Sequence, residues 1–279
     1  MTRFLDTWLN RVGLRERPAP TVDSLGLILR HQLRTIPFEN LTVLGGQVPD
    51  LDDAALERKL IADRRGGYCF ELNGLLDRAL RDLGYSVTPL MARVMWNKDA
   101  PPGPRSHLLL RVEVEGAGWL MDAGFGGPTP GVPIPCQPGV HGDPRFALKE
   151  EPGLGTVLSR KLASGEFAAL YAFTAERVGP ADIAGANWLM ATWPPSPFRS
   201  RLVAAMGDDQ LRHIVEGRSY RAASAEGEAH EENLDTPEAL FACLARVFGL
   251  SLTAAERAGA TRLCFPGEQD TTAEAIQSG

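Results

Sequence analysis

The chain has 279 residues, of which 44% are hydrophobic and 23% are charged, so it can bury a sizeable core in one to three compact units. Its formal charge of −6 lacks the basic surplus that nucleic-acid binding requires. No apolar run approaches the ~20 residues of a membrane span, and Asp6 interrupts the stretch where a signal peptide would be apolar. These features predict a cytoplasmic protein with no nucleic-acid or membrane partner.

Helical periodicity dominates the first 85 residues. Apolar side chains on one face predict a first helix that Thr2 caps and Gly13 ends. Pro37 disfavours the helical conformation at Ile36, so that residue is expected to be extended. Further helices are expected over about residues 22–33, 52–62 and 69–83.

Strand patterns follow, in segments 86–96, 107–115 and 118–124. The stretch Arg111–Glu115 alternates polar and apolar side chains, as a half-exposed strand does. A hairpin turn at Gly116-Ala117 would place Arg111 opposite Asp122. The Gly- and Pro-rich residues 126–145 predict a long loop, and more short strands are expected up to about Ala191.

The last part of the chain mixes both patterns. Thr236-Pro237-Glu238 combines a cap, a first-turn proline and an acid, which predicts a helix that Gly249 ends. Residues 267–279 are polar and are expected to fray. Helices, then strands, then a mixed unit indicate an α+β protein rather than an alternating βαβ one.

One of the four cysteines has an unusual setting. None lies in a Cys-x-x-Cys pair or clusters with histidines, so neither a metal nor a disulfide scaffold is expected. Cys69, however, follows Gly66 and Gly67 and opens an amphipathic helix. The partial positive charge of a helix N-terminus favours the nucleophilic thiolate, although a buried structural cysteine would fit the same position.

A thiolate nucleophile needs an imidazole and a group that orients it. Among five histidines, His107 begins a strand, and it shares a sheet face with Asp122 at the end of the next strand. The expected register separates them by four residues, or ~13 Å, so a bulge or another register would have to close the gap. A structural histidine remains the alternative reading.

Several motifs in order resemble the arylamine N-acetyltransferase family. The resemblance runs from Ile36-Pro37-Phe38-Glu39-Asn40-Leu41 through Arg65–Asn73, Ser106-His107 and Asp122–Gly127 to Ser196-Pro197-Phe198. It implies a helical bundle over 1–85, a β-barrel-like domain over 86–195 and an α/β lid over 196–279, with a cysteine-protease-like core. A structural ion pair between Glu39 and Arg64 or Arg65 is a further hypothesis.

The resemblance also implies a site and a reaction. Cys69, His107 and Asp122 would be the catalytic triad, and acetyl-CoA would be the co-substrate, with no metal or prosthetic group. Acetyl transfer to arylamines, arylhydrazines or N-hydroxyarylamine oxygens would pass through a thioester, as in xenobiotic metabolism. The residues implied for the acceptor cleft are Phe38, Phe125 and Phe198, and those near the CoA pyrophosphate are Gly126 and Gly127.

Two other activities use the same triad chemistry. An amide synthase of the same family would act on carrier-bound acyl chains, and a cysteine peptidase-like hydrolase would cleave peptides without CoA. The match loosens after about residue 200, so acceptor preference stays open. The oligomeric state is open too, a homo-oligomer included.

Overall fold

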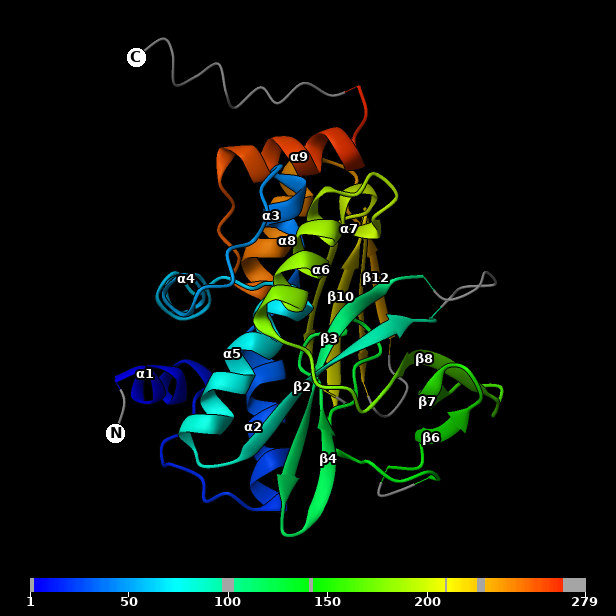
Figure 1. Cartoon of the computed structure of the whole chain (residues 1–279). Coiled ribbons are helices and arrows are strands. Elements are labelled where there is room, and N and C mark those ends of the chain that lie inside the picture. The colour runs from blue at the N-terminus through cyan, green and yellow to red at the C-terminus, as the bar shows by residue number, and fades with distance from the viewer. Residues whose placement is uncertain (1–2, 97–102, 141–142, 209, 225–228, 268–279) are drawn as a thin grey trace.

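Helices of the N-terminal part lie beside the central strands in the computed structural model, which describes residues 3–96, 103–140, 143–208, 210–224 and 229–267 (Figure 1). The Thr21 hydroxyl caps the second helix by accepting from Ser24 N, and Ile36 is extended, as Pro37 requires. The predicted cap at Thr2 lies outside the described residues. The helices of this part are α1 (Arg3–Val12), α2 (Val22–Thr35), α3 (Leu41–Leu44), α4 (Asp53–Leu56) with the π-helical turn η1 (Glu57–Ala62), and α5 (Cys69–Asp82).

A seven-stranded, nearly closed, barrel-like sheet forms the centre, in the order β5-β4-β3-β2-β8-β7-β6. Its pairs of neighbouring strands are antiparallel. The two-residue strand β5 interrupts the predicted loop over 126–145. The strands are β2 (Ser86–Val94), β3 (Arg105–Val114), β4 (Ala117–Met121), β5 (Ile134–Pro135), β6 (Phe146–Glu151), β7 (Gly155–Lys161) and β8 (Phe167–Phe173).

The predicted hairpin register between β3 and β4 is wrong by two residues. The turn lies at Glu115-Gly116, where both residues have positive φ, and Arg111 pairs with Leu120 rather than with Asp122. Asp122 therefore follows Met121, the partner of Leu110. A bulge in the pairing of β2 with β3 also lies next to His107, because Ala92 pairs with His107 while Arg93 pairs with Arg105.

The expected strands do not continue to Ala191, because α6 (Pro180–Thr192) occupies that segment. Its start is specified locally: Pro180 opens the helix, and the Asp182 carboxylate accepts from Gly179 N. A short helix, α7 (Pro197–Ser200), follows, with Ser196 as its cap.

A second sheet, in the order β1-β9-β10-β11-β12, joins the start of the chain to its last third. Phe38 of the short strand β1 (Phe38–Glu39) pairs with Ala205. The predicted helix after Thr236 is confirmed: the Thr236 hydroxyl accepts from Ala239 N, and Gly249 ends it with φ 66°. The other elements are β9 (Val203–Gly207), β10 (Leu211–Glu216), β11 (Ser219–Ser224), β12 (Ala229–Asn233), α8 (Pro237–Phe248) and α9 (Ala254–Cys264).

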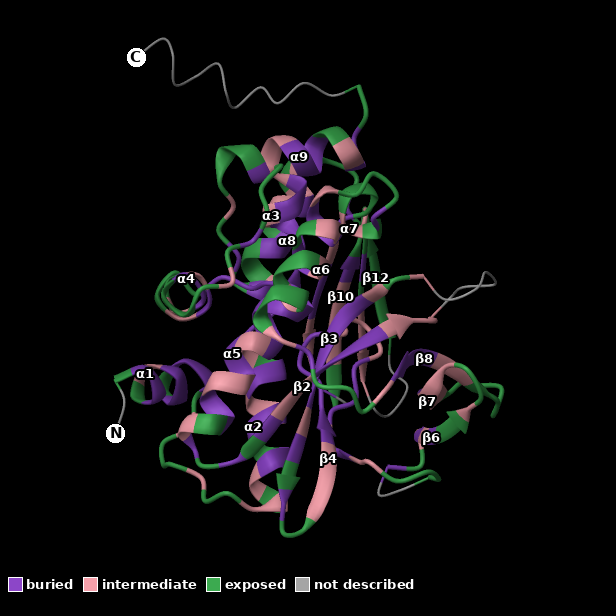
Figure 2. Cartoon of the chain, in the orientation of Figure 1, coloured by how far each residue is buried: buried purple, intermediate pink, exposed green. Residues whose placement is uncertain are grey.

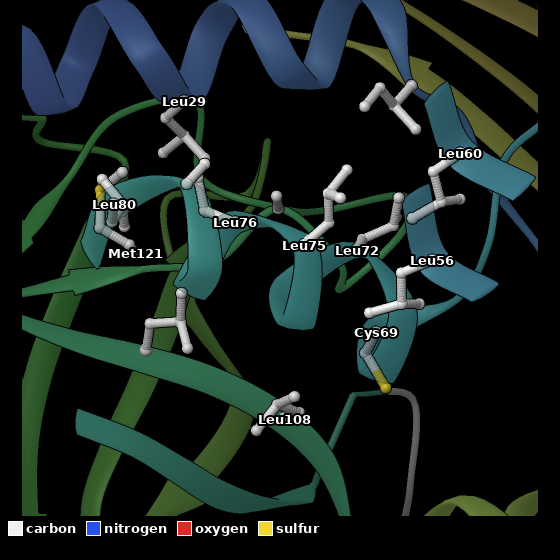
Figure 3. Close-up of a cluster of buried hydrophobic side chains, with 14 of the residues drawn as sticks. Leu29, Leu56, Leu60, Cys69, Leu72, Leu75, Leu76, Leu80, Leu108 and Met121 are labelled. Atoms are coloured by element: carbon white, nitrogen blue, oxygen red, sulfur yellow. The ribbon is translucent and has the colours of Figure 1, made fainter. Parts of the chain in front are cut away.

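Buried side chains form three hydrophobic clusters, visible as the purple inner faces of the helices and strands in Figure 2. The largest joins the N-terminal helices to β2–β4 and includes fully buried Trp8, Leu29 and Leu76. Burying one such large apolar side chain contributes about 1.5–3 kcal/mol. In Figure 3, Cys69 lies at the edge of this cluster and its sulfur points away from Leu72 and Leu75. The cluster thus anchors α5, while the Cys69 sulfur at its first residue points away from the packed leucines.

The α+β class expected from the sequence is confirmed. Among the described helices, none has both the length and the apolar character that crossing a membrane would need.

Candidate active site

Cys69 is the first residue of α5 and is only 2% exposed. The preceding residue, Tyr68, is extended, and its N–H donates to the Glu71 carboxylate at 3.1 Å, which completes the helix start. The Cys69 Sγ lies 3.8 Å from the Ser106 carbonyl oxygen. The thiol therefore sits where the free N–H groups and the dipole of α5 favour negative charge.

The two glycines before Cys69 serve close packing within the chain. A Cβ on Gly66 would lie 2.2 Å from the Pro37 carbonyl oxygen, and one on Gly67 would lie 2.6 Å from a Glu71 carboxylate oxygen. A residue with a Cβ would therefore clash at either position. Glycine at both positions lets the segment 65–68, called the cysteine loop below, lie directly against β1 and against α5.

The corrected hairpin register brings His107 and Asp122 together. Two residues now separate their levels along the strands, about 7 Å instead of ~13 Å. The His107 Nε2 and Asp122 Oδ2 atoms are 2.8 Å apart, and both side chains are almost fully buried. Cys69 lies close enough to His107 to help raise the pKa of the imidazole, after the larger effect of Asp122. The structure thus places the three predicted triad residues in one connected group.

Asn73, which was not predicted as a site residue, holds Asp122 in place. Its Nδ2 donates to Asp122 Oδ1 at 3.0 Å and to the Leu108 carbonyl at 2.7 Å, and its Oδ1 accepts from Ala123 N at 2.9 Å. Gly124 N donates to the same Asp122 oxygen at 2.9 Å. Asn73 lies four residues after Cys69 on one helix face, and that spacing is the sequence signal that could have identified it.

The electrostatics favour a charged His107–Asp122 pair. Burial alone would lower the pKa of His107, but Asp122 and then Cys69 oppose this and raise it to about 10. Burial would likewise raise the pKa of Asp122, but the imidazolium, Asn73 and the Gly124 N–H lower it below its ordinary value. His107 is therefore held as imidazolium at neutral pH.

We expect the stabilising effect of His107 to depend on pH in a defined direction. Its pKa is about 10 in the folded chain, above the ordinary value near 6.5. A raised pKa stabilises the folded state fully below about pH 6.5, and this contribution is lost as the pH rises through about 10. The difference in free energy of unfolding between wild type and His107→Gln should therefore shrink between about pH 6 and pH 10, as measured by urea denaturation. A difference that stays constant or grows over this range would contradict the assignment.

The other described histidines do not meet Cys69. His31 Nδ1 lies 2.9 Å from the Val12 carbonyl oxygen, His213 Nδ1 lies 2.9 Å from the Tyr220 hydroxyl, and His230 is exposed beside Glu232. His141 lies outside the described residues. Among the described residues, no group of three or more His, Cys, Asp or Glu side chains is arranged to hold a metal ion.

Several aromatic rings pack against one another around Tyr68 and His107. Phe38 and Phe198 have ring centroids 6.1 Å apart, and Phe125 lies 5.1 Å from the ring of His107. Tyr68 packs against Phe198 at 5.3 Å and so joins the cysteine loop to this group. Two of the three predicted acceptor residues are thus neighbours, and the third packs against His107.

Tyr171 also lies beside His107, and no local motif marks it in the sequence. Its ring lies 5.1 Å from both His107 and Phe125. The buried hydroxyl faces Asp122 without meeting hydrogen-bond geometry. Burial, and then the nearby Asp122 carboxylate, hold the pKa of Tyr171 well above its usual value. Tyr171 therefore stays neutral and forms one wall around the imidazole.

Gly126 and Gly127 lie between Phe38 and the β10 strand. Gly126 has φ 87°, and a Cβ on it would lie 3.5 Å from the Phe38 ring. The Gly127 carbonyl accepts a hydrogen bond from Arg212. A small pocket adjoins this loop and is lined in part by Phe38, Gly126 and Arg212.

The hypothetical ion pair behind the site is formed by Arg65. Its Nη2 donates to Glu39 Oε1 at 3.0 Å. Arg64, the other candidate, adopts φ 53°. Glu39 is 1% exposed and also accepts from Leu41 N at 2.7 Å. This buried pair fixes β1 beside the cysteine loop.

Comparison with known proteins gives consistent results. A family model described as N-acetyltransferase matches residues 21–257. The arylamine N-acetyltransferase / N-hydroxyarylamine O-acetyltransferase of Salmonella typhimurium is 35% identical over 264 residues, covering 90% of each chain. The solved structure of the Salmonella typhimurium arylamine N-acetyltransferase covers 93% of this chain and 98% of its own, with 34% identity and a TM-score of 0.87. That of the Mycobacterium marinum arylamine N-acetyltransferase in complex with CoA covers 94% and 100%, with 32% identity and a TM-score of 0.86.

Proposed function

The chain belongs to the arylamine N-acetyltransferase family, and we propose that it moves an acetyl group from acetyl-CoA to arylamines through a thioester on Cys69. The observation that carries the proposal is the buried group of Cys69 at a helix N-terminus, His107, and Asp122 at 2.8 Å from the imidazole. The relatives' names and the CoA complex of the Mycobacterium marinum protein support the choice of acceptor and donor.

In the first step, the Cys69 thiolate attacks the carbonyl carbon of the acetyl thioester. His107 stands beside it as the imidazolium that Asp122 stabilises. The carbon–sulfur bond to CoA then breaks, and the leaving thiolate takes a proton from His107. Backbone N–H groups at the start of α5 would stabilise the tetrahedral oxyanion, and one such donor is typically worth about 3–4 kcal/mol in the transition state.

In the second step, an amine attacks the acetyl-Cys69 carbonyl. His107, now neutral, accepts the amine proton, and the Cys69 thiolate leaves as the amide forms, which restores the ion pair. Exchange between two thioesters is close to balanced in energy, so the intermediate is not a deep trap. The same intermediate can pass its acetyl group to an arylhydrazine or to the oxygen of an N-hydroxyarylamine.

The substrate contacts follow from the positions of the aromatic rings. Phe38, Phe125 and Phe198 would hold the acceptor ring by stacking and edge contacts. Gly126 and Gly127 have little side-chain bulk, so their backbone would admit the CoA pyrophosphate at close range.

Initial-rate kinetics test the two-step order. Rates measured over a grid of acetyl-CoA and arylamine concentrations should give parallel double-reciprocal lines, because CoA leaves before the amine binds. Intersecting lines would contradict the covalent route. Absence of any reaction with acetyl-CoA, together with acyl transfer from a carrier-bound chain, would favour the amide-synthase alternative.

A further inference from the structure

A buried group of charges lies behind the cysteine loop and includes a residue from the far end of the chain. Arg65 donates to Glu256 through both terminal nitrogens, Nη1 at 3.1 Å and Nη2 at 2.8 Å. The Arg65 Nη2 also reaches Glu39 at 3.0 Å. Glu256 is 5% exposed. It meets Arg65 in the fold although 191 residues separate the two along the chain. Arginine held through both nitrogens by one carboxylate is fixed in direction as well as in place.

Glu256 is itself rigidly held. It lies in the first turn of α9, where its Oε2 accepts from Thr253 N at 2.8 Å and its own N–H donates to the Thr253 hydroxyl at 3.3 Å. The helix packs closely on α3, since a Cβ on Gly259 would lie 2.1 Å from the Leu44 carbonyl oxygen. The carboxylate is therefore a fixed point of the last helix.

The contact continues from Arg65 to the nucleophile through the backbone. Gly67 N donates to the Pro37 carbonyl at 3.2 Å, and Glu39 N donates to the Gly67 carbonyl at 2.9 Å. These bonds tie the loop between Arg65 and Cys69 to β1. On the other side of the loop, Lys59 holds Glu71 at 2.6 Å, and Glu71 accepts from Tyr68 N. Arg65 is joined to both sides of this turn, because its side chain donates to Glu39 and its N–H donates to the Lys59 carbonyl at 2.9 Å.

Glu256 and Glu39 act differently on Arg65. Glu39 accepts one hydrogen bond from Arg65, and its other carboxylate oxygen accepts from Leu41 N. Glu256 accepts from both terminal nitrogens of the Arg65 guanidinium. Without the Glu256 charge, Arg65 keeps a counterion but loses the contacts that set its orientation. The expected consequence is a displaced loop in a chain that still folds.

We propose that Glu256 is a positioning residue for acetyl transfer, fixing through Arg65 the loop that presents the Cys69 thiol to acetyl-CoA. The inference rests on the proposed role of Cys69 as the nucleophile. Because a nucleophile displaced by about 1 Å can lose up to ~10²-fold in rate, the effect should fall on the chemical step rather than on acetyl-CoA binding.

Glu256→Gln in the full chain tests the proposal, with Thr236→Ala as the control for a loss of helix capping. Thr236→Ala removes the cap of the neighbouring helix α8 and leaves the bonds between Glu256 and Arg65 in place. At saturating acetyl-CoA, Glu256→Gln should acetylate Cys69 at least about tenfold more slowly than wild type, with the half-saturating acetyl-CoA concentration unchanged. Thr236→Ala should lower the Tm and keep the wild-type rate.

Alkylation of Cys69 by iodoacetamide across pH gives a readout that needs no acetyl-CoA. Glu256→Gln should alkylate more slowly than wild type, and Glu256→Asp, which keeps the charge, should recover part of the rate and serves also if the Gln variant does not fold. Wild-type acetylation and alkylation rates in folded Glu256→Gln, or an equal loss in Thr236→Ala, would overturn the inference. If wild type is alkylated but not acetylated, the proposed function fails, while the alkylation rates still decide the role of Glu256.

Discussion

Cys69→Ser should lower arylamine acetylation by about 10⁴-fold or more while leaving the fold intact. The hydroxyl is close in size to the thiol, so the buried surroundings of residue 69 need not rearrange. Serine, however, is not ionised by the neighbouring imidazolium at neutral pH, and removing one member of a catalytic group removes most of its effect. The measurement is steady-state turnover with acetyl-CoA and an arylamine, together with the Tm.

Cys243→Ser is the matched control for this prediction. Cys243 is also 2% exposed, but it lies on α8 in the core beneath the second sheet. Its substitution should leave turnover near wild type. Turnover within tenfold of wild type in Cys69→Ser would exclude a thioester at this position as the main route.

Asp122→Asn should reduce kcat by about 10³–10⁴-fold, because the amide moves the ring proton of His107 from Nε2 to Nδ1. The oxygen of residue 122 must remain where Asn73 and Gly124 donate to it. The new NH2 group then faces His107 Nε2 and donates to it. The neutral ring must carry its proton on Nδ1, and it can no longer form the imidazolium that pairs with the Cys69 thiolate.

The control for this second prediction is Asp143→Asn, another largely buried carboxylate with hydrogen-bonded partners, located just before β6. It should retain wild-type kcat. The acetyl-CoA concentration at half-saturation should change little in Asp122→Asn, since the carboxylate stabilises the reacting group and not the bound substrate. Near-normal kcat in Asp122→Asn would remove Asp122 from the triad.

The sequence predicted the local features of the site well. Two glycines, a cysteine and an amphipathic run specify a helix that begins at Cys69, because the cap and the apolar face are encoded within a few residues. The same holds for the helix after Thr236. Asn73 could have been predicted too, because a residue four positions after Cys69 lies on the same helix face.

The wrong predictions, the β3–β4 register and strands in place of α6, come from segments whose sequence patterns compete or are weak. The hairpin could turn at Glu115-Gly116 or at Gly116-Ala117, and the choice moved Asp122 by two residues relative to His107. The two glycines Gly116 and Gly118 favoured the later turn, but the observed two-residue turn has positive φ at both Glu115 and Gly116, as a type I′ turn requires. The α6 segment has apolar residues without a clear single face, so its helix start at Gly179-Pro180 was the only strong signal.

Contacts between distant segments could not be predicted from pattern alone. Tyr171 meets His107 across the barrel-like sheet, and Glu256 meets Arg65 from the last helix. Neither residue carries a local signature, because its role exists only once the sheets have assembled. The domain boundaries near residues 85 and 195 likewise remain predictions.

The most direct test of the central claim is the intact mass of the purified chain after mixing with acetyl-CoA alone. We expect a gain of one acetyl group, mapped to the peptide that contains Cys69, absent in Cys69→Ser and lost when an arylamine is added. An unchanged mass under conditions in which the arylamine is nevertheless acetylated would contradict it.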